Sequence, residues 1–281
     1  MITLSNVHGQ LYDVKQGNFP DGTLHMSLPH DRIRDIRWKY ESDAELFTLI
    51  CIRKHYSDAD MRLIMPYIPH ARMDRVKADE DVFTLKYFCE IINSLNFEEV
   101  VVLDAHSNVS LALLNNVKQI SVEDSICDTL YQVTCKICGG YDHQERMEAQ
   151  ANLIVFYPDE GSMKRYSDML NMPYAFGIKK RDWETGKILG LDIMNADLVK
   201  GKNVLIIDDI CSRGGTFLHS SKALKAAGAD RIFLYVTHAE NTMVEGEMYN
   251  DPDLVEGIYT TNSIFNEDLD NLNKVTIITE F

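Results

Sequence analysis

The amino-acid sequence predicts an α/β protein with two domains. The chain has 281 residues, more than one hydrophobic core usually serves, so two domains are expected. Short apolar runs alternate with helical patterns, which is typical of parallel βαβ units rather than hairpins. The polar stretch 139–146 is the candidate boundary, so we place the domains at residues 1–145 and 146–281.

Two strands and a helix are expected in the first half. Residues 62–68 form an apolar run that predicts a strand despite Pro66, and residues 82–95 carry apolar side chains at helical spacing. A further strand is expected at 100–103, followed by the segment Asp-Ala-His at 104–106. Polar groups directly after a strand are candidates for ligand binding.

The second half repeats this arrangement with a better-defined unit. The expected strands are 153–157, 174–178, 204–207 and 232–236, with a helix at 217–227 that Gly228 closes. Polar residues again follow the strands, at the edge where open α/β sheets bind ligands. We therefore look for chemistry at the strand ends.

Composition excludes several classes of function. A formal net charge of -15 disfavours a broad nucleic-acid footprint, which needs a surplus of Lys and Arg on one face. The N-terminus has no basic and apolar signal pattern, and no run of about 18 apolar residues occurs. We expect a cytoplasmic protein without a nucleic-acid or membrane partner.

The six cysteines do not suggest a disulfide framework in a chain of this length. Cys135 and Cys138 form a lone C-x-x-C, with Cys127 and His143 nearby. These four could ligate zinc, but a second clear ligand pair is missing. Reduced structural thiols are the preferred interpretation, and the role of Cys135 and Cys138 stays open.

The most informative segment follows the expected strand at 204–207. Asp208 and Asp209 come directly after it, and a Gly214-Gly215-Thr216 turn opens a helix. Adjacent carboxylates suit the vicinal hydroxyls of a ribose, and a helix N-terminus with glycines suits a phosphate. No G-x-x-x-x-G-K-[ST] or G-x-G-x-x-G motif explains the segment. The alternative is an ordinary surface loop with a solvated acidic pair.

This segment resembles the phosphoribosyl-pyrophosphate loop of the phosphoribosyltransferase fold, and the N-terminal half narrows the resemblance. Residues 65–75 and 102–106 look like the corresponding motifs of ribose-phosphate pyrophosphokinases. Residues 19–22 resemble the adenine-binding turn of that family, and 157–161 its acidic turn; Thr237-His238 also fits. The resemblance implies two tandem phosphoribosyltransferase-like domains, each with a mainly parallel sheet flanked by helices, and assembly into a homo-oligomer.

The resemblance also implies an activity. Members of the family transfer the β,γ-pyrophosphate of ATP to the C1 hydroxyl of ribose 5-phosphate and release AMP, with Mg²⁺. Such a reaction develops negative charge on the transferring group and on AMP, so positioning and cations must stabilise it. The expected substrates are ATP and a ribose 5-phosphate-type sugar.

Site residues are implied by the same motifs. His106 and Asp159 would hold magnesium, and Lys180, Arg181 and His106 would act in catalysis. The other implied residues bind ATP, namely Phe19, Asp21, Arg72, Asp74 and Arg75, or the ribose phosphate, namely Asp208, Asp209, Ser212, Arg213, Gly214, Gly215 and Thr216.

Each of these residues also has an ordinary interpretation. His106 could be a structural histidine, and Lys179-Lys180-Arg181 could be a solvated basic patch. Arg72 and Arg75 could be surface salt-bridge partners of Asp74 and Glu80.

The chain departs from the family pattern at several positions. Ser212 and Arg213 stand where an acidic residue and a threonine are usual, Thr23 where glutamate is common, and Asp182 where an arginine often follows. A cation beside the 5-phosphate site favours an acceptor with more negative charge, such as ADP-ribose. Short, divergent, phage-type relatives that act in NAD recovery resemble the chain here, so ADP-ribose is the second acceptor hypothesis.

Two rival functions stay open. A phosphoribosyltransferase acting on a base would share Asp208, Asp209 and the glycine turn, but would leave Arg72, Asp74 and His106 unexplained. A noncatalytic regulatory subunit would keep the fold without the chemistry. The sequence does not decide the oligomeric state, the acceptor, or allosteric regulation by phosphate or ADP.

Overall fold

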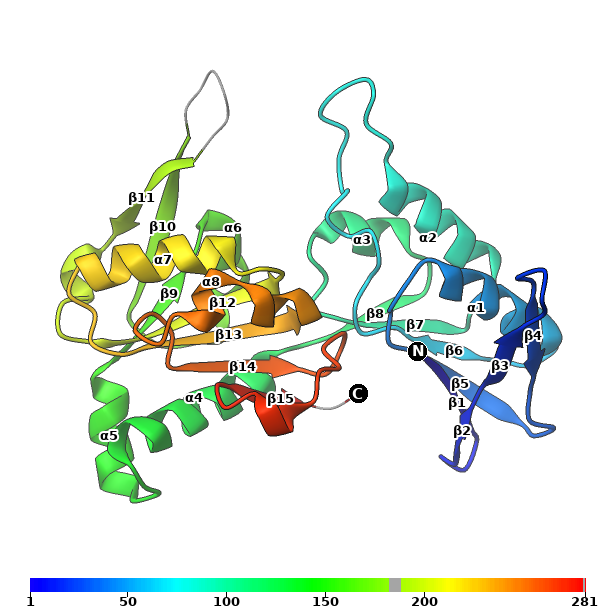
Figure 1. Ribbon diagram of the computed structural model, residues 1–281, viewed down its shortest axis with the longest axis horizontal. Helices are drawn as coiled ribbons and strands as arrows, with labels where there is room; N and C mark the ends of the chain where they lie inside the picture. Colours follow the sequence, from blue (N-terminus) through cyan, green and yellow to red (C-terminus); the bar gives the residue numbers. More distant parts are fainter. Residues whose placement is uncertain (182–187, 280) are drawn as a thin grey trace. The chain divides into compact units, whose positions relative to one another are not determined.

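The computed structural model describes residues 1–181, 188–279 and 281, with the backbone alone at 179–181, 188, 189 and 271. The chain forms two compact units, Met1–Ser121 and Val122–Phe281, each built on its own sheet (Figure 1). Both sheets are mainly parallel and carry helices, so the predicted α/β class is confirmed.

The first unit contains a six-stranded sheet in the order β2-β1-β5-β6-β7-β8. β5 to β8 are parallel, whereas β1 runs antiparallel to both β2 and β5. A separate antiparallel hairpin joins β3 to β4. The strands are β1 (Ile2–Asn6), β2 (Leu11–Asp13), β3 (Lys15–Asn18), β4 (Leu24–Ser27), β5 (Ile33–Trp38), β6 (Arg62–Ile64), β7 (Glu99–Leu103) and β8 (Val117–Ile120).

Three helices complete this unit, namely α1 (Ala44–His55), α2 (Thr84–Ser94) and α3 (Asn108–Leu113). Leu63 of β6 and Val102 of β7 are buried in one core with Leu49 of α1 and Phe88 of α2. Burying a side chain of this kind contributes about 1.5–3 kcal/mol. The helices thereby hold β6 and β7, and with them the start of the loops that follow these strands.

The second unit contains a seven-stranded sheet in the order β11-β10-β9-β12-β13-β14-β15. All neighbours are parallel except β10 and β11. The strands are β9 (Leu153–Tyr157), β10 (Tyr174–Arg181), β11 (Ile188–Met194), β12 (Asn203–Cys211), β13 (Ile232–Ala239), β14 (Gly257–Thr261) and β15 (Val275–Thr279).

Helices cover both faces of the second sheet. On one face, Ile206 of β12 shares a core with Phe217 of α7 and Met248 of α8. α4 and α6 pack against the other face, with α6 behind the strands in Figure 1. The helices are α4 (Glu123–Cys138), α5 (His143–Ala151), α6 (Glu160–Tyr166), α7 (Gly215–Ala226) and α8 (Glu247–Asn250), with 3₁₀ turns η1 (Ser167–Met169), η2 (Ala196–Leu198), η3 (Asn241–Glu245) and η4 (Leu269–Asn271).

The chain divides earlier than the boundary expected near residue 145. The division falls between Ser121 and Val122, because α4 belongs to the second sheet. Lys136 Nζ of α4 donates to Glu256 O at 3.0 Å, and Arg231 Nη1 donates to Lys136 O at 3.3 Å. The polar stretch 139–146 therefore consists of the connection 139–142 between α4 and α5 and the first turn of α5.

Several strands differ in length from their expected bounds. β6 ends at Ile64, before Pro66, because proline has no N–H to give to a ladder. β12 continues to Cys211, so Asp208 and Asp209 lie within the strand rather than after it. The sheets are also not wholly parallel, since antiparallel pairs occur in both units.

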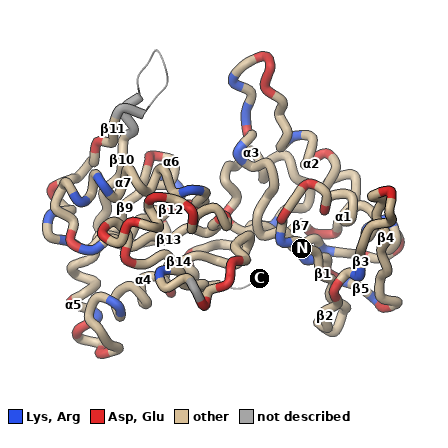
Figure 2. Tube along the Cα trace, in the orientation of Figure 1, with Lys and Arg blue, Asp and Glu red and all other residues tan. Residues whose placement is uncertain are grey.

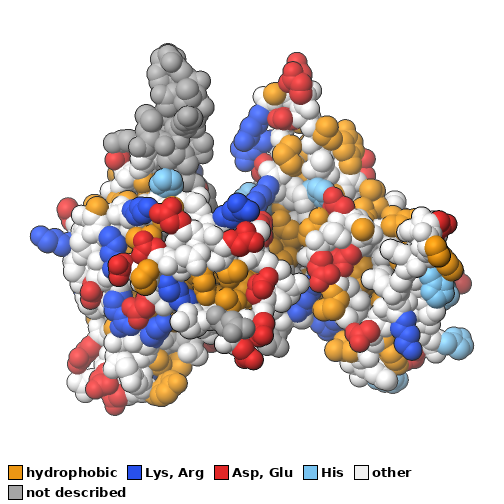
Figure 3. Space-filling view, in the orientation of Figure 1, with side chains coloured by type: hydrophobic (Ala, Val, Ile, Leu, Met, Phe, Trp, Pro, Cys, Tyr) orange, Lys and Arg blue, Asp and Glu red, His pale blue; other side chains and the backbone are white. Residues whose placement is uncertain are grey.

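No helix in the described part of the chain is long and apolar enough to cross a membrane. Acidic and basic residues are scattered over both units in Figure 2, and they are interspersed on the face drawn in Figure 3.

Candidate active site

The loop after β6 carries the residues expected to bind ATP. Its start stays attached to the sheet, because Met65 N donates to Val101 O and Leu103 N donates to Pro66 O, both at 2.9 Å. His70 then adopts a left-handed backbone conformation with φ 63°. That turn directs the chain toward Arg72 and Asp74, which follow it.

Asp74, Arg75 and His106 lie together in the first unit. Arg75 Nε donates to Asp74 Oδ1 at 2.8 Å, and its Nη2 donates to Oδ2 at 3.2 Å. The Arg75 guanidinium holds the pKa of Asp74 below its usual range, and Ser107 and His106 lower it further. Asp74 is only 8% exposed. The two motifs that follow β6 and β7 therefore converge on one carboxylate.

His106 is positioned by an unusual backbone residue. Asp104 follows β7, is buried, and has φ 41°, a left-handed value that is uncommon outside glycine. This turn lets the chain leave the sheet directly after Leu103 and brings His106 beside Asp74. Backbone strain of this kind occurs preferentially at functional sites.

Arg75 forms the salt bridge with Asp74 that was the alternative to a phosphate-binding role. Arg75 is exposed, and its guanidinium is engaged by a neighbouring side chain. Its role toward a phosphate would need this pair to open or to be shared, because a fork of N–H donors can serve two acceptors. Arg72 is exposed in the same loop.

Phe19 and Asp21 do not join this group of residues. They lie in the turn of the β3–β4 hairpin. Asp21 Oδ1 accepts a hydrogen bond from Thr23 Oγ1 at 2.7 Å there, and this bond lowers the pKa of Asp21. Phe19 is half exposed and packs edge-on against His25. Figure 1 shows the hairpin at the other end of the unit from the loop before α2.

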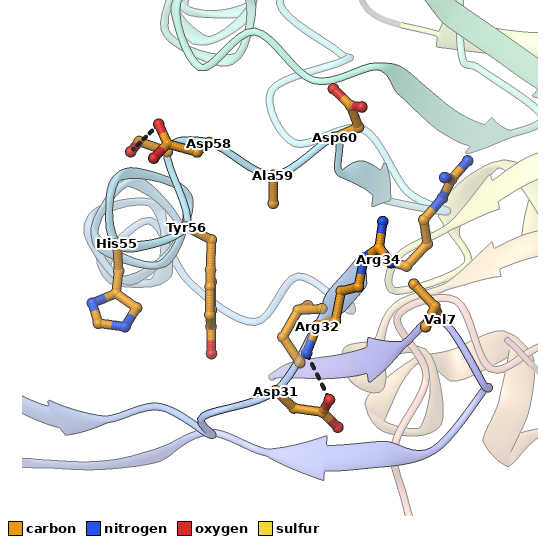
Figure 4. A pocket seen from close by; sticks show the side chains of 11 residues that line it. Val7, Asp31, Arg32, Arg34, His55, Tyr56, Asp58, Ala59 and Asp60 are labelled. Atoms are coloured by element: carbon orange, nitrogen blue, oxygen red, sulfur yellow. Dashed lines mark hydrogen bonds between the residues drawn. The ribbon is translucent and has the colours of Figure 1, made fainter.

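Two cavities of the first unit lie away from Asp74. One of ≈ 460 Å³ is formed at the end of α1 and the start of β5, where Arg32, His55 and Tyr56 face it (Figure 4). The other, of ≈ 720 Å³, lies between the β3–β4 hairpin and the first turns of α1. Of these two cavities, the second lies beside the hairpin turn that carries Phe19 and Asp21, which were expected to bind ATP.

In the second unit, the two acidic residues of β12 face opposite sides of the sheet. Side chains alternate along a strand, so Asp208 shares the face of Ile206 and α7, and Asp209 the face of α6. Arg165 of α6 contacts Asp209 there, with Nη1 3.3 Å from Oδ2. Of the two carboxylates, Asp209 is thus the one with an ion pair among the described side chains.

Asp208 is set deeply among protein atoms, although part of its side chain reaches the surface. Burial raises its pKa well above the usual value, and repulsion from Asp209 and Asp159 adds to the shift. A carboxyl in this condition is stabilised by any cation or hydroxyl donor that arrives beside it. The site at the end of β12 is thus prepared for a ligand with such groups.

The loop that follows β12 ends in the predicted glycine turn. Gly214 has φ 75°, and α7 begins at Gly215, so the free N–H groups of its first turn lie at Gly215, Thr216 and the residues after them. Ser212, Arg213 and the turn follow the carboxyl end of the strand that carries Asp208. The predicted residues 212–216 thus form one continuous turn that follows the strand carrying Asp208 and Asp209.

Asp159 begins α6 as its N-cap. Its Oδ1 accepts from Gly161 N at 3.0 Å and Ser162 N at 3.1 Å, and Ser162 completes a capping box. Its charge also raises the pKa of Asp208, so the two carboxylates are close. One oxygen of Asp159 therefore has a structural role.

The carboxylates of the second unit fit a magnesium ion. Mg²⁺ prefers oxygen ligands and usually takes one or two protein carboxylates, with waters and substrate phosphates completing its shell. Asp159 and Asp208 supply such oxygens, and their mutual repulsion favours a cation. An imidazole such as His106 is a less favoured ligand. In the described residues, no cluster of three or more His, Cys, Asp or Glu is placed to hold a metal alone.

Lys180 and Arg181 belong to the backbone of β10, and Lys180 pairs with Gly190 of β11. Their side chains, and the whole of Asp182, lie outside the described residues.

Cys135 is buried, and Cys138 Sγ lies 3.6 Å from Cys135 O.

Sequence reasoning missed Arg165 and its contact with Asp209. The available signal was position: Arg165 lies six residues after Asp159, on the helix that follows β9. β9 and β12 are adjacent parallel strands, so groups after the carboxyl end of one strand come close to those after the other. Strand order was needed to use that signal.

Comparison with known proteins identifies relatives of the chain. Residues 162–269 match the family model of the phosphoribosyl transferase domain. The ribose-phosphate pyrophosphokinase of Saccharolobus solfataricus is 27% identical over 240 residues, covering 81% of this chain and 77% of its own. That of Pyrococcus abyssi is 25% identical over 280 residues, covering 96% and 90%.

A solved structure agrees with the fold. The phosphoribosylpyrophosphate synthetase of Mycobacterium smegmatis superposes with a TM-score of 0.72 at 16% identity, covering 98% of this chain and 88% of its own. Both units are therefore included in the structural match and in the alignment with the Pyrococcus protein. The chain is therefore similar over nearly its whole length to ribose-phosphate pyrophosphokinases.

Proposed function

We propose that this protein transfers the β,γ-pyrophosphate of ATP to the C1 hydroxyl of ribose 5-phosphate, giving phosphoribosyl pyrophosphate and AMP with Mg²⁺. The observation that carries the proposal is the turn after β12, where Asp208 and the helix N-terminus at Gly215 follow one another. A pentose phosphate offers what this turn can bind, namely hydroxyls for the carboxylate and a phosphate for the N–H groups.

In the proposed reaction, the C1 oxygen attacks the β-phosphorus of ATP. The bond from that phosphorus to the oxygen bridging it to the α-phosphorus breaks, AMP leaves with the electron pair, and the hydroxyl proton passes to solvent. Asp159 and His106 are proposed to hold Mg²⁺, which would offset the negative charge of the phosphates. The task of the chain is positioning and electrostatic stabilisation.

The first unit is proposed to bind ATP. Arg72, Asp74 and Arg75 belong to the loop that follows β6, and His106 lies beside Asp74. Phe19 and Asp21 are proposed to hold the adenine from the hairpin turn. Lys180 and Arg181 are proposed to contact the transferring phosphates. We also propose that the protein acts in the cytoplasm as a homo-oligomer.

ADP-ribose is a second candidate acceptor because of Arg213. This residue is exposed at the turn after β12, where the 5-substituent of the sugar is proposed to bind. A guanidinium there suits the bidentate recognition of a diphosphate.

The proposal is tested by incubating the full-length protein with ATP, Mg²⁺ and either sugar while following AMP. We expect AMP with ribose 5-phosphate, and mass spectrometry of the products will rank ADP-ribose against it. Pyrophosphate release from phosphoribosyl pyrophosphate plus a base, with no need for ATP, would establish a phosphoribosyltransferase instead. Failure to form AMP with either sugar would favour a regulatory subunit.

A further inference from the structure

The segment after β13 packs along the proposed phosphate-binding turn. Glu240 N donates to Cys211 O at 2.8 Å, and Ser212 Oγ lies 3.4 Å from Thr242 Oγ1. Arg213 Nη2 then donates to Glu245 Oε2 at 3.4 Å. Cys211, Ser212 and Arg213 therefore contact residues 240, 242 and 245 in the same order along the chain.

Two glycines allow this close packing, Gly246 against the backbone and Gly214 against the side chain of Met248. A Cβ on Gly246 would lie 2.1 Å from Arg213 O, so only glycine allows the segment to approach the turn so closely. A Cβ on Gly214, which already has φ 75°, would lie 2.9 Å from Met248 Cε. The position of Arg213 relative to Glu245 is thus fixed by main-chain contacts rather than by their flexible side chains.

The ion pair itself is easily opened. The side chain of Arg213 is 75% exposed and that of Glu245 is 60% exposed. Exposed pairs of this kind contribute little to stability, since water and salt screen them. A phosphate offers a guanidinium a shorter, bidentate contact. An anion that reaches the turn can therefore displace the glutamate.

We propose that Glu245 is a specificity-determining residue, which competes with the phosphate of the acceptor for the guanidinium of Arg213. This inference rests on the proposed function, because it takes the turn at Gly214 as the place where the phosphate binds. In the free protein, Glu245 balances the charge of Arg213. In the complex, the phosphate takes its place, so Glu245 sets the affinity of the turn for anionic sugars.

Calorimetric titration with ribose 5-phosphate, and separately with ADP-ribose, tests the competition without requiring turnover. The variant is Glu245→Gln in the full chain. The matched control is Glu247→Gln, which removes the same charge nearby but from a pair with Lys222 at 2.7 Å. We expect Glu245→Gln to tighten ribose 5-phosphate binding about two- to fivefold, the range of an exposed ion pair. The control should leave the Kd unchanged.

A double-mutant cycle with Arg213→Thr separates competition from a general charge effect. In the Arg213→Thr background, Glu245→Gln should no longer change the Kd, and neither glutamate substitution should shift Tm appreciably. Equal effects of Glu245→Gln and Glu247→Gln would overturn the inference. Failure of the wild-type protein and of Glu245→Gln to bind either sugar would also overturn it.

Activity measured in parallel distinguishes the two failures. If AMP is formed but the two glutamate variants behave alike, the transferase stands and the role of Glu245 falls. If the predicted Kd pattern appears without AMP formation, the role of Glu245 stands and the proposed reaction falls.

Discussion

At the scale of single residues, the neighbours Asp208 and Asp209 have different environments. Asp209 is 6% exposed and contacts Arg165, whereas Asp208 carries a raised pKa caused first by burial. The pattern of two adjacent acids predicted a ligand site at this position. It could not assign the roles, because alternation on an extended strand sends the side chains to opposite faces.

Replacing Asp208 by Asn should stabilise the free protein and weaken ribose 5-phosphate binding. The substitution removes a desolvated charge, so we expect the free energy of unfolding at pH 7 to rise by roughly 0.5–2 kcal/mol. The pKa is higher in the folded than in the unfolded state, where it is near 3.8, so the gain appears only as the pH rises above that value. Urea unfolding at pH 3 and pH 7 measures it.

The exposed Asp197→Asn is the control for that experiment. A loss of stability at pH 7 in Asp208→Asn, with no change in Asp197→Asn, would contradict the claim that the buried charge of Asp208 destabilises the free protein.

Replacing Arg165 by Gln should destabilise the protein, because it leaves the buried Asp209 carboxylate without this cation. We expect a loss of about 1–3 kcal/mol in the free energy of unfolding. Lys164→Gln, on the same helix, breaks only the exposed pair with Glu160 and should cost less than about 0.5 kcal/mol. Comparable losses in the two variants would show that Arg165 is dispensable to Asp209.

At the scale of elements, α4 is attached to the second sheet by a charged group of residues. Arg231 pairs with the Glu256 carboxylate and also donates to Lys136 O and Ile137 O, while Lys136 donates to Glu256 O. Arg231 holds the pKa of Glu256 below its usual value of 4.5. These contacts hold the C-terminal end of α4 against the second unit.

This group should make stability dependent on pH in acid. A carboxyl with a lowered folded-state pKa stabilises the protein above its unfolded pKa, and the contribution is lost as the pH falls below 4.5 through the folded value. Because Glu256 is partly exposed, the effect should be only about 0.5–1 kcal/mol. Urea unfolding between pH 3 and pH 6 should show a smaller slope for Glu256→Gln than for the wild type; identical slopes would exclude this role.

Periodicity located β7, β9, α2 and α7 to within a few residues, because each has an uninterrupted apolar pattern. It did not identify β1 to β4 as strands, since β2 and β3 are short and mostly exposed. It predicted no helix at α4, and the expected boundary near residue 145 put the residues of α4 in the first domain, whereas they lie in the second compact unit. The contacts that attach α4 join Lys136 to Glu256, residues far apart in the sequence, and local patterns contain no information about them.

At the scale of the whole molecule, the order of the motifs predicted the two-unit α/β fold and the family. Within the first unit, the structure unites Asp74, Arg75 and His106 but leaves Phe19 and Asp21 on a separate hairpin. Within the second, it unites Asp159, Asp208 and the glycine turn. The sequence could not predict which charged residues pair. The pairs of Arg165 with Asp209 and of Glu245 with Arg213 depend on the three-dimensional packing of the chain.

The most direct test of the account is the product balance of the reaction with ATP, Mg²⁺ and ribose 5-phosphate. Mass spectrometry should find a sugar that has gained two phosphoryl groups at C1, with one AMP released for each and no ADP. Asp208→Asn should reduce both products together. Formation of ADP with a singly phosphorylated sugar, or no change in either product in Asp208→Asn, would contradict the account.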